Sequence, residues 1–239
     1  MGSARAGAED QHRLVAGRAG AASYSSDMSD LWWAVPAGSE SGWGIQLVQR
    51  NATIFATMFV YGSDGASAWY VSTMLPAASQ FTWSGDLYAT TGPWFATVPF
   101  DPTKVSVRKV GTMAFAPADI FDATLSYTVD GAAVAKSITR ETLVSENYNG
   151  HYGGVVHETV ITCAESARNG VFESTPILNI VQTNTSITLE RIPSNGTSCT
   201  YTGTLSQSGQ MGDIKGNYQC SDGSGGIFRI VELQVTRSA

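Results

Sequence analysis

The chain carries one spacing pattern twice, and this internal repeat constrains its fold more than any single residue does. The segment Ile45–Gln49 is followed by Asn51 and Ile54, and the segment Leu178–Gln182 is followed by Asn184 and Ile187, 133 residues later throughout. Further matches at smaller offsets pair Ser63–Gly65 and Tyr70 with Ser194–Gly196 and Tyr201, and Gly85–Leu87 with Gly203–Leu205. A drifting offset is what loop-length changes between two copies of one fold produce. The repeat therefore predicts two related domains.

Alternating side chains and tight-turn signals identify the repeated unit as a β-structure. Trp43, Ile45 and Leu47 alternate with smaller or polar residues, while the strand expected at 54–61 is apolar on both faces. A strand buried on both sides indicates a closed or tightly packed sheet. Asp64-Gly65 and Asp130-Gly131 are two-residue hairpin signals, and no stretch has convincing helical periodicity. We therefore expect an all-β protein of two antiparallel meander domains, each a small barrel or a barrel-like sandwich.

The same patterns suggest where the domains begin and end. The Gly-, Ala- and Ser-rich start predicts an N-terminal tail at 1–30 that is disordered or vector-derived. An aromatic-rich barrel domain is expected at 31–145, and a barrel domain that contains a disulfide is expected at 146–239.

Composition limits the classes of partner. Charged residues make up 14% of the chain, against a typical value of about 25%, and the net charge is -6. No basic cluster exceeds Arg108-Lys109, so the electrostatic footprint that nucleic acid or anionic lipid requires is missing. No apolar run approaches the roughly 20 residues of a membrane-spanning helix. We therefore expect no nucleic-acid partner and no transmembrane segment.

The cysteines suggest a compartment. In an up-and-down meander, Cys199 and Cys220 flank a hairpin centred near Ser208 and lie almost opposite each other, which favours a disulfide between them. A bridge between Cys163 and Cys199 is the alternative. Either disulfide implies an extracytoplasmic location, whether periplasmic, secreted or at the cell surface.

A series of tryptophans and glycines gives the first domain a distinctive signature. It comprises Leu31–Trp33, Pro36, Glu40–Ile45, Ile54–Thr57, Phe59, Tyr61, Gly65 and Trp69-Tyr70. Over 31–92 this series resembles a module that recurs in uncharacterised secreted and lipid-anchored proteobacterial proteins, although Arg50-Asn51 and Met58 depart from the usual pattern. That resemblance implies a β-module and no known activity. The glycine and tryptophan at the start of the meander more loosely resemble the avidin and lipocalin group (calycins), which implies ligand capture in a barrel mouth.

Aromatic side chains are the strongest candidates for a binding site. One interpretation is a flat apolar pocket or a sugar-stacking platform; the other is that the rings only fill the cores. Because adjacent strand residues face opposite sides, Trp32 and Trp33 cannot both lie in one core. The candidate ligand-binding residues are Trp33, Trp43, Phe59, Tyr61, Trp69 and Tyr70.

Titratable residues form no convincing catalytic or metal-binding motif. Glu40, Asp86, Asp119 and Asp122 are scattered over predicted loops and turns, and His151 and His157 share a strand face without a third ligand. No phosphate-binding loop or nucleophile elbow is present. We therefore predict no catalytic residue, no metal and no cofactor.

Three functions remain compatible with the sequence. The favoured one is a secreted or periplasmic, non-catalytic binding module that captures a small apolar or glycan ligand in the aromatic-lined first domain. A structural or adhesive surface protein that assembles into homo-oligomers is the first alternative. A barrel enzyme of isomerase or cyclase type is the second, and the missing titratable cluster counts against it.

Overall fold

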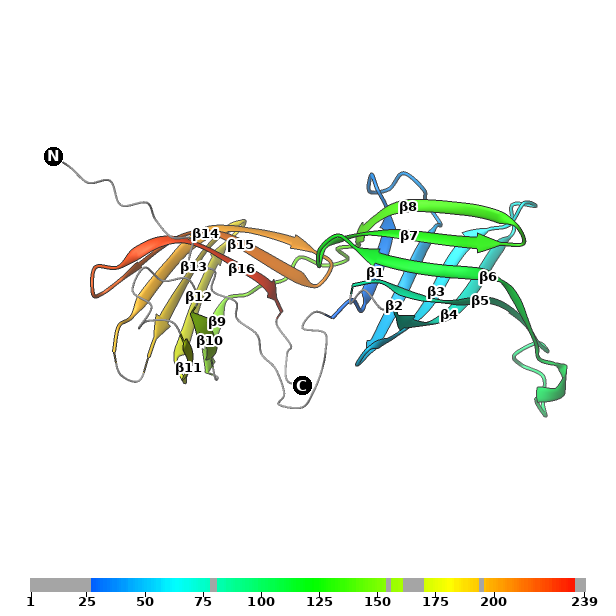
Figure 1. The fold of residues 1–239 in the computed structure, drawn as a ribbon, viewed down its shortest axis with the longest axis horizontal. Helices are drawn as coiled ribbons and strands as arrows, with labels where there is room; N and C mark the ends of the chain where they lie inside the picture. The colour runs from blue at the N-terminus through cyan, green and yellow to red at the C-terminus, as the bar shows by residue number, and fades with distance from the viewer. Residues whose placement is uncertain (1–26, 78–80, 154–155, 161–169, 194–195, 235–239) are drawn as a thin grey trace. The chain divides into compact units, whose positions relative to one another are not determined.

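The structure is a computed structural model that describes residues 27–77, 81–153, 156–160, 170–193 and 196–234. The chain divides into two compact units, with the boundary between Leu143 and Val144. Both units are built from antiparallel strands, as Figure 1 shows, which confirms the predicted all-β class with two domains. Residues 1–26 of the predicted tail lie outside the described part. The next residues belong to the first unit, because Met28 is buried and Asp30 begins its first strand.

The first unit is a closed barrel of eight strands in sequence order. They are β1 (Asp30–Ala34), β2 (Gly44–Arg50), β3 (Thr53–Tyr61), β4 (Ser67–Pro76), β5 (Trp83–Thr91), β6 (Ser106–Pro117), β7 (Asp122–Val129) and β8 (Ala132–Arg140). A 3-10 turn, η1 (Pro102–Lys104), precedes β6. The ring closes where β8 pairs with β1, with Trp32 opposite Arg140 and Ala34 opposite Ile138.

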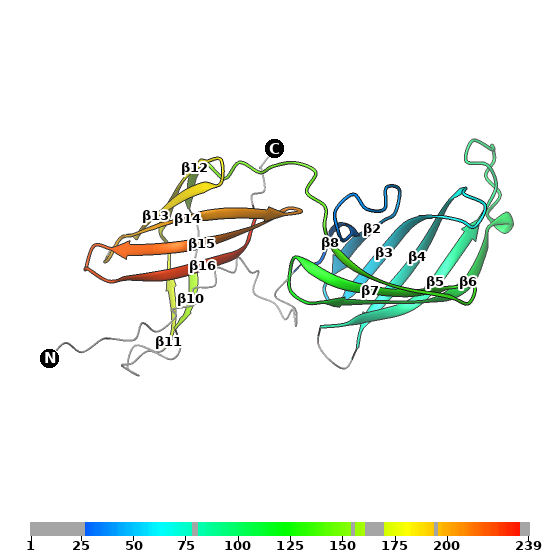
Figure 2. The ribbon, with the colours of Figure 1, turned by 90° about the horizontal axis from the view of Figure 1, so that it is seen from above.

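The second unit is an open sheet. Its strands are β9 (Gly150–Gly153), β10 (Val156–Val160), β11 (Gly170–Ser174), β12 (Ile177–Thr183), β13 (Ser186–Ile192), β14 (Cys199–Ser208), β15 (Met211–Cys220) and β16 (Gly225–Leu233). Six of them form one sheet in the order β16-β15-β14-β13-β12-β9, and Figure 2 shows β12 to β16 in succession. Strands β10 and β11 pair with each other in a separate sheet. Their pairing continues the register of β9 with β12, so Val156 lies opposite Ser174 as Gly153 lies opposite Ile177. The sequence predicted a small barrel or a barrel-like sandwich for each domain; only the first is a closed barrel among the described strands.

A glutamine occupies the same structural position in both units. The Met28 N–H donates to Gln49 Oε1 (2.9 Å), and Gln49 Nε2 donates to the carbonyl of Asn51 (3.0 Å). In the second unit, the Tyr148 N–H donates to Gln182 Oε1 (2.9 Å), and Gln182 Nε2 donates to the carbonyl of Asn184 (3.1 Å). Each glutamine thus connects the segment before the first strand of its unit with the turn that directly follows the glutamine's own strand. The repeat therefore extends to Met28 and Tyr148, which the sequence pattern did not include.

The pairing registers correct two parts of the sequence repeat. Tyr70 corresponds to Cys199 and not to Tyr201, because Tyr70 pairs with Met58 as Cys199 pairs with Arg191. Gly203 lies on β14, which corresponds to β4, so its match with Gly85 on β5 is wrong. The true counterpart of Gly85 is Gly216 on β15. A Cβ atom added to Gly85 would lie 2.3 Å from the Thr73 carbonyl oxygen, and one added to Gly216 would lie 2.1 Å from the Thr202 carbonyl oxygen. Both positions require glycine because the neighbouring strand approaches so closely.

The predicted disulfide is confirmed. Cys199 and Cys220 lie directly opposite each other on β14 and β15, with their Cα atoms 4.0 Å apart. Cys199 pairs across the sheet with Arg191, as Tyr70 pairs with Met58 in the barrel. The bridge therefore stands where the barrel has an aromatic ring. Cys163 lies outside the described residues.

A buried arginine joins the last barrel strand to the first. The Arg140 side chain is fully buried; its Nε donates to the Ile120 carbonyl (2.5 Å) and its Nη2 to the Asp27 carbonyl (2.6 Å). Its Nη1 donates to Asp30 Oδ2 (3.0 Å), and the guanidinium lies 4.8 Å from the centroid of the Trp32 ring. Because every one of these partners comes from another segment, Arg140 fastens the seam of the barrel.

We expect Gly216→Ala to destabilise the second unit by about 1–3 kcal/mol, because the new methyl group would overlap the Thr202 carbonyl. Gly153→Ala is the matched control in the same sheet, since nothing lies within 4 Å of an added Cβ there. Calorimetry measures both, and the second-unit transition is the one that disulfide reduction lowers. Equal effects of the two substitutions would contradict this explanation.

We expect Arg140→Met to destabilise the barrel by about 3–5 kcal/mol, because it leaves Asp30 and several carbonyl groups without their buried partner. The control is Arg108→Met, which removes an exposed arginine from a surface pair with Asp130 and should hardly change the midpoint temperature. Thermal unfolding of the barrel measures both effects. A small effect of Arg140→Met would show that strand pairing alone closes the ring.

Candidate binding site at the open end of the barrel

The two ends of the barrel interior differ in burial. At the end where β1 begins and β8 ends, the floor is filled by Trp32, Trp83 and Phe115, with the Trp32 and Phe115 rings 5.2 Å apart. At the other end, inward-facing side chains are only partly buried. We call this second end the barrel mouth and define it by Trp43, Val60, Tyr70, Ala89, Val129 and Val134. The loops that connect β1–β2, β3–β4, β5–β6 and β7–β8 surround it.

Two polar contacts hold the Trp43 ring at the mouth. Its Nε1 donates a hydrogen bond to the Tyr127 hydroxyl oxygen (3.1 Å). The Lys136 ammonium lies 5.4 Å from the centroid of the Trp43 ring, and Lys136 Nζ donates to both carboxylate oxygens of Glu40 (2.5 and 2.6 Å). Lys136 shares the inward face of β8 with Val134 and Ile138, so this cation belongs to the mouth. The ring is thus oriented before any ligand arrives.

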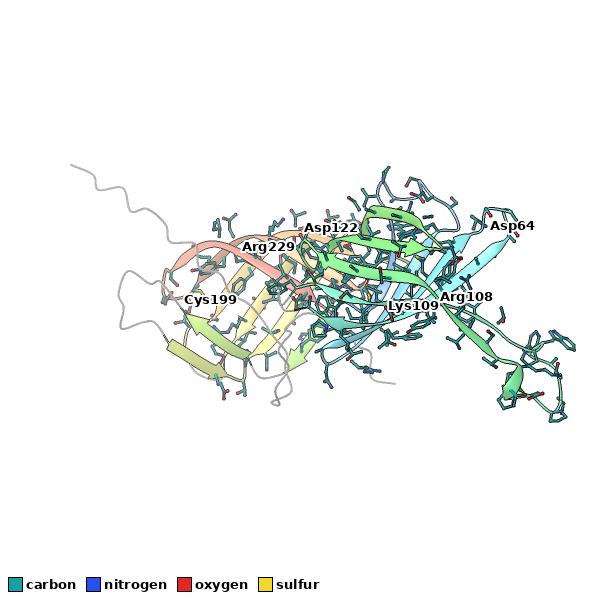
Figure 3. All side chains as sticks on the ribbon, turned by 45° about the vertical axis from the view of Figure 1, so that its right-hand side comes forward. Asp64, Arg108, Lys109, Asp122, Cys199 and Arg229 are labelled. Atoms are coloured by element: carbon teal, nitrogen blue, oxygen red, sulfur yellow. A yellow bond between two sulfur atoms is a disulfide. The ribbon has the colours of Figure 1, made fainter. Side chains whose placement is uncertain are left out.

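A second ion pair stands at the mouth beside Tyr70. Arg108 Nη2 donates to Asp130 Oδ2 (2.9 Å), and Figure 3 labels Arg108 on β6 near the start of that strand. The hydrogen bond with Asp130, and then its charge, raise the pKa of the Arg108 guanidinium, with a smaller contribution from Tyr70. The same hydrogen bond lowers the pKa of the Asp130 carboxyl group. The pair of Arg108 with Asp130 therefore stays charged at neutral pH. Together with the pair of Lys136 with Glu40, it gives the mouth a polar rim.

A buried hydroxyl group lies below the mouth. Ser72 is 1% exposed on the inward face of β4, between Tyr70 and Met74, and its Oγ has no hydrogen-bond partner within the described part of the chain. Buried hydroxyl groups are nearly always hydrogen-bonded, so this one is unusual. It provides a polar point on an otherwise apolar wall.

The six aromatic residues selected from the sequence do not line one pocket. Trp43 and Tyr70 face the barrel interior. Phe59, Tyr61 and Trp69 point outward and are 47%, 59% and 49% exposed. Phe59 and Trp69 are directly paired across β3 and β4, so they form an outer aromatic pair. Trp33 faces away from the core that buries Trp32, as expected for adjacent residues on a strand.

Sequence reasoning missed Tyr127, Lys136 and Arg108. The signal for Lys136 was available, because Val134, Lys136, Ile138 and Arg140 alternate with Ala135, Ser137 and Thr139 along one strand. A lysine on an otherwise apolar strand face is a candidate for a mouth or a buried pair. For Arg108 and Tyr127 the sequence has no comparable signal.

A shallow hollow of about 430 Å³ lies on the outer surface of the barrel. Small side chains of β5 to β8 border it, including Ser84, Thr112, Ala114, Ser126 and Ala133. It has hydroxyl groups but neither a carboxylate nor a basic side chain among its lining residues. Such a surface has nothing to orient a ligand chemically, and we assign it no role.

Titratable groups elsewhere form no cluster of metal ligands within the described residues. Asp213 in the second unit is buried, with its Oδ1 2.8 Å from Arg229 Nε and its Oδ2 3.3 Å from Lys215 Nζ. The side chain of His157 lies outside the described part, so its pairing with His151 is not described. Within the described residues, no three His, Cys, Asp or Glu side chains gather as metal ligands would. No helix in the same part has the length and apolar character to cross a bilayer.

Comparison with models of known protein families and with curated proteins gives no match for this chain. The resemblance to the secreted proteobacterial module and the looser one to calycins therefore stay predictions.

We expect Ser72→Ala to stabilise the barrel by about 1 kcal/mol, because it removes a buried hydroxyl group that has no described partner. Ser67→Ala on the same strand is the control, since Ser67 is exposed and its replacement should be nearly neutral. Chemical denaturation of both variants decides the matter. A loss of stability in Ser72→Ala would show that the hydroxyl group has a hydrogen-bond partner in solution.

Proposed function

We propose that the chain is an extracytoplasmic, non-catalytic binding protein that holds a small apolar ligand in the barrel mouth. The observation that carries this proposal is the contrast in burial along the barrel interior, with a fully packed floor below and partly buried rings and aliphatic side chains above. Concave apolar sites with a few oriented polar groups are typical of small-molecule binding sites.

The packed floor restricts how a ligand binds. Trp32, Trp83 and Phe115 leave no route through the base, so a ligand enters and leaves through the mouth. It rests against Trp43 and Tyr70 and does not pass deep into the barrel. This geometry suits a compact ligand better than a long chain.

The wall chemistry favours an apolar ligand over a glycan. The hydrogen-bonding groups of Trp43 and Tyr127 are bonded to each other. Of the other members of the mouth only Tyr70 has a polar group in its side chain, and the rest are Val60, Ala89, Val129 and Val134. A sugar requires several free donors and acceptors to replace its bound water, and this wall has few. The ion pairs at the rim can orient one polar group on the ligand.

The disulfide supports an extracytoplasmic location, because such bridges persist in oxidising compartments. The rim carboxylates do not favour an enzyme. Glu40 accepts hydrogen bonds from Lys136, and Asp130 accepts them from Arg108, so both carboxylates are occupied by a cation. The hydrogen bond from Arg108 lowers the pKa of Asp130, whereas a general base needs a raised one. The proposed role is therefore capture and retention.

The test is binding of a fluorescent apolar probe, 1-anilinonaphthalene-8-sulfonate, followed by native mass spectrometry of protein from its own host. We expect Trp43→Ala to weaken probe binding at least about tenfold, because it removes the oriented ring. Ala89→Phe should also abolish binding, because the larger side chain fills the mouth. This second variant keeps Trp43, so it tests the same site even if Trp43→Ala fails to fold.

The matched control is Trp69→Ala, which removes a ring of the same type from the outer surface and should leave probe binding unchanged. Loss of binding in Trp69→Ala together with normal binding in both mouth variants would overturn the proposal. That result would place the probe on the outer aromatic pair.

A further inference from the structure

The connection between β5 and β6 exposes an unusual amount of apolar surface. Trp94, Phe95, Val98 and Phe100 are 69%, 87%, 92% and 51% exposed. From Gly92 to Phe100 the sequence contains no charged residue. We call residues 92–100 the apolar loop. Clustered side chains of this kind on a protein surface mark an interaction site.

The apolar loop stands away from the barrel that carries it. Figures 1 and 3 show it as an extension beyond the ends of β5 and β6. Its tip is locally organised: the Thr97 N–H donates to the Trp94 carbonyl (2.9 Å), and the Trp94 and Phe95 rings lie 5.6 Å apart. Asp101 Oδ1 accepts a hydrogen bond from the Thr103 N–H (3.0 Å) at the start of η1. The Trp94 and Phe95 rings are therefore exposed on a loop that is ordered by its own hydrogen bonds.

Charges follow directly behind the apolar tip, and they are balanced. Lys104 Nζ lies 3.9 Å from Asp101 Oδ2, and Lys109 Nζ lies 2.7 Å from Asp86 Oδ1. The pair of Arg108 with Asp130, described above, is the third. Three cations thus pair with three carboxylates on the barrel side of the loop. The aromatic tip is therefore followed by paired charges.

We propose that the apolar loop inserts into the surface of a phospholipid bilayer with zwitterionic headgroups. Tryptophan at the tip matches the boundary between acyl chains and headgroups, where its amphipathic ring is enriched. Phenylalanine suits the apolar side of the same boundary. Balanced ion pairs behind the tip match headgroups that themselves carry paired charges. The net charge of -6 opposes attraction to an anionic surface, so apolar burial drives the contact.

The shape of the loop favours a lipid surface over a protein partner. A stable protein interface takes about 20–30 residues from each side. The apolar loop has nine residues and stands out from the barrel, so it makes a small contact on a flat partner. A bilayer surface adapts to a protrusion of this kind.

The experiment is co-sedimentation with phosphatidylcholine vesicles, which needs no ligand in the barrel mouth and so does not depend on the proposed function. We expect the unaltered protein to sediment with the vesicles, and the double variant Trp94→Ser/Phe95→Ser to bind at least about tenfold more weakly. Raising the salt concentration should not release the protein, because screening acts on charges. Brominated phosphatidylcholine should quench tryptophan fluorescence only while Trp94 is present.

The matched control is Phe59→Ser/Trp69→Ser, which removes the outer aromatic pair and should leave vesicle binding unchanged. An equal loss in this control would overturn the proposal, as would failure of the unaltered protein to bind vesicles. Binding that requires phosphatidylglycerol and disappears at high salt would also overturn it, in favour of attraction between charges. A change of oligomeric state on mutation of the loop, without vesicle binding, would assign the loop to protein contact instead.

Discussion

Closure of the first barrel depends on the seam between β8 and β1, and Arg140 is the side chain that fastens it. A barrel has no free edge only if its last strand returns to its first. Arg140 stands opposite Trp32 in that pairing and gathers the carbonyl groups of Asp27 and Ile120 with the Asp30 carboxylate. The same residue covers the Trp32 ring and completes the floor. Arg140 therefore contributes both to the β8–β1 pairing and to the packed floor. The mouth is the opposite end of the barrel, which these residues do not cover.

The two units share a framework and differ in how it is completed. Gln49 and Gln182 make equivalent contacts, and Gly85 and Gly216 allow equivalent close approaches between strands. Only the first unit continues through β7 and β8 to a closed ring among the described strands. The second unit has a disulfide where the first has Tyr70, so a covalent link between β14 and β15 occupies the position of a ring at the mouth. The shared glutamine and glycine positions account for the sequence repeat. Ring closure in the first unit and the disulfide in the second account for the differences between the units.

Exposed apolar groups of the barrel gather in three places with different meanings. The barrel mouth is apolar and partly buried, and it is the proposed site for a small ligand. The outer aromatic pair of Phe59 and Trp69 lies on the side of the barrel. The apolar loop is convex and nearly fully exposed, and the β5–β6 connection to which it belongs is one of the loops that surround the mouth. The proposed ligand site and the proposed membrane contact thus lie in neighbouring parts of one barrel and share no residue.

The sequence by itself predicted the strands, their hairpins and the two-domain repeat, because these follow from local alternation and turn residues. It favoured the bridge between Cys199 and Cys220, which flank one turn, over the alternative with Cys163, and the structure decided between them. Only the tertiary structure decided which face of β3 points inward. Phe59 and Tyr61 lie on one face of β3, and Met58 and Val60 lie on the other. Because both faces are apolar, alternation separates the two sets but does not indicate which of them faces the interior. Ring closure buries the second set and leaves the rings outside. Lys136 and Arg108 reach the mouth through strands far along the chain, and a contact of that kind depends on closure, which no local pattern encodes.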